Sequence, residues 1–387
     1  MNPAAAEHGI FADHPGGNIV VERREGSCLW LAPDLRHMQA GCQWFYWSFR
    51  AHNENPLTVV FSHRNYISAH GPAMSRDGGA TWKWLGRENV RQREIGEHGV
   101  ELAFDLPPVR PGEDVRYAFC PQYQESHLRS WLRRHEDHPF LSVSEFCRSR
   151  GGRSVEQIRI GDACGTRKIL WLTARHHSCE AMAGYALEGM LEAALADDAT
   201  GRRLRENFTM VAMPFMDKDG VEEGDQGKLR HPHDHNRDYN ATPLFPEVAA
   251  AMRYGRENKD AITAFLDLHC PMVHGPWDNR FYLVGSPLPA VAARQDAFMK
   301  AFAESRTGAI APHEGGILHF GEAWNTADNF SAGKSATLWA EETFPDAGVI
   351  ASFEVPYANA DGMKVTPESA RSLGRDLAVA LLACPSP

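Results

Sequence analysis

The chain carries a histidine and a glutamate three residues apart, where a buried strand turns into a helix. His177 and Glu180 follow the apolar run KILWLTA and precede the helical stretch AMAGYALEGML. A strand end that opens into a helix sets side chains outside the carboxyl edge of a sheet, where open α/β sheets bind ligands. An imidazole nitrogen and a carboxylate oxygen can hold one cation there. The alternative is a turn histidine beside an acid favoured by the helix dipole.

A second strand end supplies another histidine. His269 ends the apolar run AITAFLDLH, again at an expected carboxyl edge, so the two strand ends can converge. Two histidines and one glutamate, with a fourth position left to water, are the ligand set of hydrolytic zinc sites. The competing interpretation is a core histidine with satisfied hydrogen bonds, and the strand-end position argues against it. We therefore expect one zinc ion per chain, held by His177, Glu180 and His269.

Between these strand ends lies a long polar stretch, residues 213–240, which directly follows another buried strand. Long polar loops in such places are typically functional. The stretch contains Arg230 and Arg237, with Asn236 beside the second. A guanidinium group suits a carboxylate, or the oxygen charge of a tetrahedral intermediate. The alternative for each arginine is a solvated surface charge.

The same stretch crowds His231, His233, Asp234 and His235 into five residues. A histidine-rich tract can bind a metal by itself. Because these residues come from a loop rather than from converging strand ends, we expect them to line the pocket and to support the zinc ligands. Asp234 can orient a zinc-bound histidine by accepting its second N–H.

The elements that position these residues follow two patterns. From about residue 17 to 120, short aromatic strands separated by turn-rich pieces predict a β-sandwich. From about residue 165, near-continuous apolar strands alternate with amphipathic helices, which predicts a mostly parallel sheet covered on both faces. A helix starting near Ser126 marks the change. We therefore expect two domains, residues 1–122 and 123–387, the second of the α/β class.

Composition narrows the function classes. The chain has 387 residues, 43% hydrophobic and 23% charged, with a formal net charge of -10. Acidic and basic residues are mixed along the chain without a cluster of Lys and Arg, so neither nucleic acid nor an anionic membrane surface is an expected partner. The first twenty residues lack the features of a signal peptide, and no stretch approaches the ~18 apolar residues of a membrane span.

Cysteine usage bears on the compartment. Eight cysteines are scattered without CxxC pairs, which in a chain of this length predicts reduced thiols and a cytoplasmic protein. They stand at positions 28, 42, 120, 147, 164, 179, 270 and 384.

Five segments in chain order, ARHHSCE, DKDGV, DHNRDY, FLDLH and ASFEVPYANADG, resemble the zinc metallocarboxypeptidases, most closely the cytosolic carboxypeptidase subfamily. The resemblance implies a carboxypeptidase-like mixed sheet flanked by helices and preceded by a β-sandwich. It also implies the metal ligands already inferred. The chain departs from the family pattern with Ser178 and Cys179 inside the metal motif, with Asp217 and Lys218 in place of Asn-Pro, and in lacking a counterpart of the pocket tyrosine.

The resemblance assigns further roles. It implies that Glu354 is the catalytic glutamate, that Arg230 steadies the oxyanion, and that Asp234 supports a metal ligand. It implies that Asn236 and Arg237 grip the terminal carboxylate of the substrate. Two other glutamates compete with Glu354, but their position before another loop indicates a solvated or structural role; they are Glu341 and Glu342.

The expected function is zinc-dependent hydrolysis of the C-terminal residue of peptides or proteins. The subfamily is associated with C-terminal glutamates, and Lys334 and Arg280 are candidate cations for the pocket floor. One alternative is a zinc deacylase of the aspartoacylase type, which is not expected to carry a sandwich domain. Another is an inactive relative that only binds carboxylate-bearing chains, and the intact metal set together with Glu354 argues against it.

Overall fold

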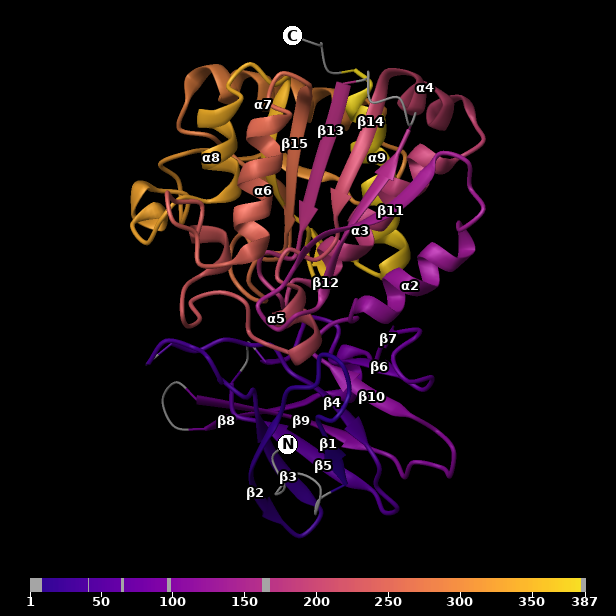
Figure 1. Cartoon of the computed structure of the whole chain (residues 1–387). Helices are drawn as coiled ribbons and strands as arrows, with labels where there is room; N and C mark the ends of the chain where they lie inside the picture. Colours follow the sequence, from indigo (N-terminus) through magenta and orange to yellow (C-terminus); the bar gives the residue numbers. More distant parts are fainter. Residues whose placement is uncertain (1–8, 41, 64–65, 96–98, 162–167, 384–387) are drawn as a thin grey trace.

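The structure is a computed structural model that describes residues 9–40, 42–63, 66–95, 99–161 and 168–383. Figure 1 shows two bodies that lie one above the other. The smaller body is β-rich and is built from the first strands of the chain, and the larger one is of the α/β class. The predicted architecture, a β-sandwich followed by a mixed, mostly parallel sheet flanked by helices, is confirmed. The division after residue 122 falls between the last sandwich strand and the first long helix, and as a domain boundary it stays a prediction.

The N-terminal part consists of two five-stranded sheets that face each other. Aromatic side chains fill the space between them; the rings of Trp47 and Phe61, for example, stack at 4.7 Å. The first sheet has the order β1 (Ile10–Phe11), β4 (Ser48–Ala51), β10 (Val115–Ala118), β6 (Ala73–Ser75) and β7 (Lys83–Trp84). The second has the order β2 (Val20–Glu25), β3 (Cys28–Ala32), β5 (Leu57–Phe61), β9 (Gly99–Leu106) and β8 (Arg91–Ile95).

The larger body is built on one eight-stranded sheet. Its central strands, β14, β13, β15 and β18, run parallel, and antiparallel pairs flank them. This is the mostly parallel arrangement that the apolar strands predict. The order is β11 (Leu141–Arg148), β12 (Ser154–Ile160), β14 (Phe208–Met213), β13 (Lys168–Ala174), β15 (Ile262–His269), β18 (Val349–Glu354), β16 (Phe281–Val284) and β17 (Pro312–Leu318).

Helices cover both faces of this sheet. Successive side chains of a strand point to opposite faces, so Leu170 and Leu172 of β13 join one core cluster, while Ile169 and Trp171 join the other. The first cluster includes α3 (Ala181–Leu195), α7 (Pro289–Ser305) and α9 (Pro367–Leu381), and the second includes α6 (Pro246–Glu257) and α8 (Ala336–Thr343). Shorter elements are α2 (Glu125–Arg134), α4 (Ala199–Asn207), α5 (Lys218–Glu223), η2 (Arg87–Asn89), η3 (His235–Arg237), η4 (Ala327–Phe330), β19 (Asn359–Ala360) and β20 (Met363–Lys364).

The two bodies are joined by hydrogen bonds from the polar stretch to the sandwich. The Gln226 side chain accepts from the Tyr46 backbone N–H at 2.8 Å and donates to its carbonyl oxygen at 2.8 Å. Asn18 donates to the carbonyl oxygen of Gly224 at 2.8 Å. The long loop is therefore held by both bodies.

The six described cysteines carry free thiols, as the sequence predicts. The other two, Cys164 and Cys384, lie outside the described residues. No helix in the described parts of the chain is both long and apolar enough to span a bilayer.

Candidate metal centre and active site

Three parallel strands end beside one another at the site. β13 ends at Ala174, and the turn that follows carries His177 and leads to Glu180, the residue that caps the N-terminus of α3. β15 ends at His269 and β18 ends at Glu354, and these two residues are register partners. The convergence of strand ends expected for the metal ligands is therefore observed, and it brings the expected base to the same edge.

A buried arginine shapes the turn after β13. Arg175 has a φ of +64°, a left-handed conformation that is uncommon for a residue other than glycine. Its guanidinium lies beneath the turn and donates to the carbonyl oxygens of Ser178 and Tyr123, the latter at 2.6 Å. These bonds satisfy the buried charge and fix the direction in which His177 leaves the strand.

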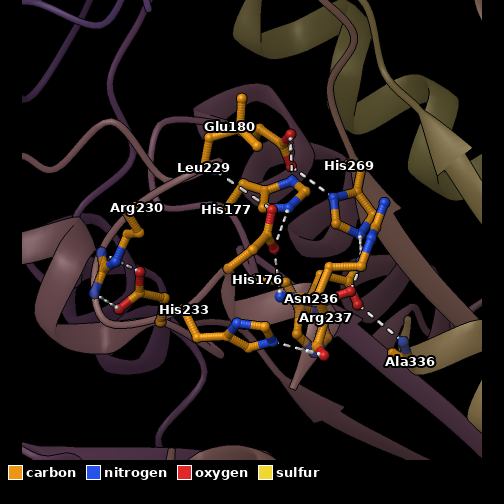
Figure 2. A network of polar contacts seen from close by, with 12 residues as sticks. His176, His177, Glu180, Leu229, Arg230, His233, Asn236, Arg237, His269 and Ala336 are labelled. Atoms are coloured by element: carbon orange, nitrogen blue, oxygen red, sulfur yellow. Dashed lines mark hydrogen bonds and ion pairs between the residues drawn. The ribbon is translucent and has the colours of Figure 1, made fainter. Parts of the chain in front are cut away.

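Glu180 lies between the two histidines (Figure 2). Its Oε1 is 2.9 Å from His177 Nδ1, and its Oε2 is 2.7 Å from His269 Nδ1. One ligand atom of each residue falls within 4.8 Å of the others. Burial alone would raise the pKa of Glu180, but the two histidines lower it to about 2, so the carboxylate is ionised. Two imidazole nitrogens and one carboxylate suit zinc.

Buried carboxylates occupy the far side of both rings. His177 Nε2 lies 3.2 Å from Asp234 Oδ1, and His269 Nε2 lies 2.8 Å from Asp267 Oδ2. Such partners fix ring orientation and tautomer, and they raise the basicity of the nitrogen that faces the metal. Both Nδ1 atoms therefore face the same point. Asp234 is where the support was expected, whereas Asp267 was not identified from sequence.

Asp267 is itself held by a buried network. Its Oδ1 lies 2.8 Å from His176 Nδ1 and accepts from Thr173 Oγ1 at 2.7 Å. His176 Nε2 lies 2.8 Å from the Tyr239 hydroxyl. The signal for Asp267 was present in the run LDLH, because an aspartate two residues before His269 on a strand faces the same side of the sheet.

Two cavities meet at this cluster. The Arg237 cavity is lined by Asn236, Arg237, Val284, Ser335, Thr337 and Ser352, among others. The Tyr282 cavity is lined by Trp44, Met272, Asp278 and Tyr282, among others. Both share a wall that contains His177 and Glu354. Trp44 shows that the N-terminal sandwich contributes to the cleft, which the sequence did not indicate.

Glu354 lines both cavities. Its Oε2 is buried and has no hydrogen-bond partner among the described residues, and burial raises its pKa to about 7. Glu341 lies on α8 and lines neither cavity, and Glu342 pairs with Lys334 at the surface. The expectation that these two glutamates are structural or solvated agrees with this placement.

Asn236 and Arg237 stand on η3 beside the metal cluster. Asn236 Nδ2 lies 3.0 Å from His269 Nε2, and its Oδ1 accepts from the Ala336 N–H at 2.9 Å. The Arg237 guanidinium donates to the carbonyl oxygen of Asn236 at 2.7 Å and to the side-chain oxygen of Asn329 at 2.8 Å. These acceptors are neutral, and burial lowers the pKa of Arg237. A buried cation with neutral partners beside a cavity favours an anionic ligand.

The structure does not bring Arg230 to this cluster. Its guanidinium lies 2.6 Å from Asp217 Oδ2 and 2.9 Å from Asp225 Oδ2, and Figure 2 shows it apart from His177 and His269. Arg230 lines neither cavity. Its charge is therefore already matched by two buried carboxylates.

The histidines of the 231–235 tract do not line the pocket, contrary to the expectation from sequence. His231, His233 and His235 are not among the residues that line either cavity. His233 Nε2 lies 3.0 Å from the Arg237 carbonyl oxygen, and His235 is fully buried. Only Asp234 of this tract contacts a candidate metal ligand within the described chain.

Comparison with known proteins agrees with this geometry. The zinc carboxypeptidase family model matches residues 128–259. Cytosolic carboxypeptidase 6 of Caenorhabditis elegans is 22% identical over 262 residues, which cover 62% of this chain and 57% of that protein. Cytosolic carboxypeptidase 2 of Danio rerio is 26% identical over 225 residues, covering 51% and 31%. The matched part of the chain thus spans 57% of the length of the first relative and 31% of the length of the second.

Solved structures share the whole fold. The metallo-carboxypeptidase from Burkholderia cenocepacia aligns with a TM-score of 0.74 at 22% identity, covering 97% of this chain and 98% of that one. The metallo-carboxypeptidase from Pseudomonas aeruginosa aligns with a TM-score of 0.73 at 21% identity over the same shares. These alignments include the N-terminal sandwich.

We predict that protein purified without added metal contains one zinc ion per chain and that His269→Ala abolishes it, because one of the three ligands is lost. Elemental analysis by mass spectrometry measures the content. His313→Ala is the matched control, since His313 lies outside both cavities and contacts Asp361. Full zinc occupancy in His269→Ala would contradict the ligand assignment.

Proposed function

We propose that this chain, whose residues 128–259 match the zinc carboxypeptidase family model, is a zinc-dependent carboxypeptidase that removes the C-terminal residue of peptides or proteins. The observation that carries the proposal is the meeting of three elements in one cleft. They are the candidate metal ligands, an unpartnered buried glutamate and a buried arginine with neutral partners.

His177, Glu180 and His269 would hold the zinc. When bound, the ion supplies a Lewis acid that polarises the scissile carbonyl and activates water. The chain itself orients the two imidazoles through Asp234 and Asp267. These two carboxylates would therefore set how tightly the site binds its metal.

Glu354 would act as the general base and then as the acid. Its free Oε2 at the shared wall is available to accept a proton from the attacking water. The hydroxyl oxygen of that water bonds to the carbonyl carbon, the C–N bond breaks, and the proton passes to the leaving amine. A pKa raised by burial to about 7 suits both transfers near neutral pH.

Asn236 and Arg237 would hold the free carboxylate of the substrate. The Arg237 cavity extends from these two residues to Glu354, so a carboxylate held there places the last peptide bond beside the metal cluster. Fixing the chain end in this way restricts cleavage to the terminal residue and orients the scissile bond.

Preference for a C-terminal glutamate is the finer part of the proposal. Neither Lys334 nor Arg280 lines the Arg237 cavity; Lys334 pairs with Glu342, and Arg280 lies 3.6 Å from Asp361. The cavity is small, about 50 Å³, and its wall presents the hydroxyls of Ser335, Thr337 and Ser352. Hydroxyls can donate to a side-chain carboxylate or amide.

We further propose a cytoplasmic location and peptide or protein C-termini as the partners. The free thiols of the described cysteines and the name "cytosolic" of the curated relatives support the location. The net charge of -10 gives no support to nucleic-acid binding.

We predict that Glu354→Gln retains zinc and the fold but loses activity by ~10²–10⁴-fold, because an amide cannot accept the proton of the water. Initial rates on a peptide with a free C-terminus, together with zinc analysis, measure both properties. Glu342→Gln serves as the control at an exposed site. An active Glu354→Gln beside an inactive Glu341→Gln would show that the base was misidentified.

We predict that Arg237→Gln slows cleavage of free-acid peptides about tenfold or more, since a hydrogen bond to a charged group contributes ~1.5–3 kcal/mol. Amidation of the substrate removes the same contact, so the two changes should be strongly non-additive in a double cycle. Arg203→Gln, an exposed residue of α4, is the control. Equal cleavage of free and amidated peptides by the unmodified enzyme would instead favour a deacylase or an endo-acting amidase.

We predict that peptides ending in Glu are cleaved faster than those ending in Phe or Arg, because the Arg237 cavity is small and lined by hydroxyls. Values of kcat/KM across a series that differs only in the last residue measure this preference. Peptides ending in Gln separate the contribution of charge from that of shape. Fastest cleavage of Phe-ending peptides would exclude the acidic preference.

A further inference from the structure

A second cation, Lys228, faces the cleft. Lys228 lines both the Arg237 cavity and the Tyr282 cavity, on the wall that also carries His177 and Glu354. Arg237 lines only the first of the two. Among the described residues on the shared wall, Lys228 is therefore the sole lysine or arginine. The shared wall is where a scissile carbonyl must lie, because the metal ligand and the base meet there.

The backbone next to Lys228 packs directly on the metal-binding turn. Gly227 has a φ of +96°, and a Cβ added there would lie 2.8 Å from the Ser178 backbone nitrogen. A side chain at this position would therefore push the loop off the turn. The Ser178 hydroxyl also donates to the Asp225 carbonyl oxygen at 3.0 Å. These contacts set Lys228 at a fixed place beside His177.

The loop is anchored on both sides of Lys228. Before it, Gln226 is hydrogen-bonded to the sandwich backbone at Tyr46. After it, the Leu229 carbonyl oxygen accepts from the Gln39 N–H at 3.0 Å, and the buried ion pairs of Arg230 with Asp217 and Asp225 tie the loop to α5. Because Arg230 is buried and paired with two carboxylates, it holds the loop backbone in place and is not available to bind a substrate.

The Lys228 ammonium has no carboxylate partner within 4.0 Å in the described part of the chain. Its Nζ lies 5.7 Å from the centre of the Trp324 ring, which borders both cavities. Lys228 and Glu354 line the same two cavities, so the ammonium stands on the wall that carries the base. An unpaired ammonium at this wall is available to a developing negative charge.

We propose that Lys228 stabilises the negatively charged oxygen of the tetrahedral intermediate, and that Arg230 positions its loop. The proposal rests on the proposed carboxypeptidase function. As water adds to the carbonyl carbon, the π electron pair moves to the carbonyl oxygen, and the ammonium donates a hydrogen bond to that oxygen. The proton stays on Nζ, and the bond weakens again when the C–N bond breaks and the carbonyl reforms. Such a donor acts on the transition state more than on the bound substrate.

The main alternative is that Lys228 binds an acidic side chain of the substrate. Its place argues against this, because the hydroxyl-lined wall of the Arg237 cavity is formed by Ser335, Thr337 and Ser352, whereas Lys228 stands at the junction of the cavities. The two roles differ in what they affect. An oxyanion donor acts on every substrate, and a side-chain receptor acts on acidic ones.

Lys228→Met tests the proposal, because it keeps the length of the side chain and removes the charge. Steady-state kinetics use the zinc-containing enzyme and peptides that end in Glu, Ala or Phe. We expect kcat to fall by ~10²–10³-fold for all three, as for the loss of one oxyanion donor, with KM and zinc content little changed. Lys228→Arg should recover part of the loss, and Lys300→Met, at an exposed position of α7, should match the unmodified enzyme.

A binding measurement provides a second readout. A phosphinic peptide carries a tetrahedral centre with an anionic oxygen, so its affinity should fall in Lys228→Met by about the same factor as kcat/KM. The affinity for the product amino acid should stay unchanged. A loss confined to Glu-ending peptides, loss of zinc, or a kcat within threefold of the unmodified enzyme would each overturn the proposal. An unmodified enzyme that cleaves no peptide would instead refute the carboxypeptidase function itself.

Discussion

The site depends on two buried carboxylates that bind the far sides of two histidines. With Asp234 at His177 Nε2 and Asp267 at His269 Nε2, the Nδ1 atoms of both rings face Glu180. Burying the carboxylates of Asp234 and Asp267 is costly unless each has a partner. Here each carboxylate contacts one of the two histidines, at the carboxyl edge of the sheet. The imidazole rings of His177 and His269 cannot turn without leaving a buried carboxylate without its partner. Their fixed orientation gives the rest of the cleft a constant reference position.

Much of the fold and the grouping of the candidate metal ligands could be predicted because both follow from periodic patterns. His177 and His269 each come after an apolar run whose length marks a strand end, and parallel strands bring such ends to one edge. Glu354 was found through its likeness to a family motif, and its register pairing with His269 gives the physical reason for its place. Asp267 was missed although its spacing from His269 carried a signal.

The loop residues could not be predicted in the same way. Lys228 and Arg230 are two cations two residues apart, and their types and spacing do not say which one faces the cleft. The choice is made by Asp217, Asp225 and the close approach of Gly227 to the metal turn. These contacts join separate segments, and loops have no periodicity that would reveal them. Trp44 was missed for a related reason, since sandwich and cleft residues meet only in three dimensions.

The hydrogen bonds between Gln226 and Tyr46 mean that the sandwich helps to build the candidate active site rather than being an appended module. The loop that carries Lys228 is held in position by a segment that lies 180 residues earlier in the chain. Exchanging sandwiches between relatives would therefore also replace one wall of the cleft, through Trp44, and the support of its loop. A substitution in the 44–46 segment would therefore alter the support of the 225–230 loop together with the wall of the cleft.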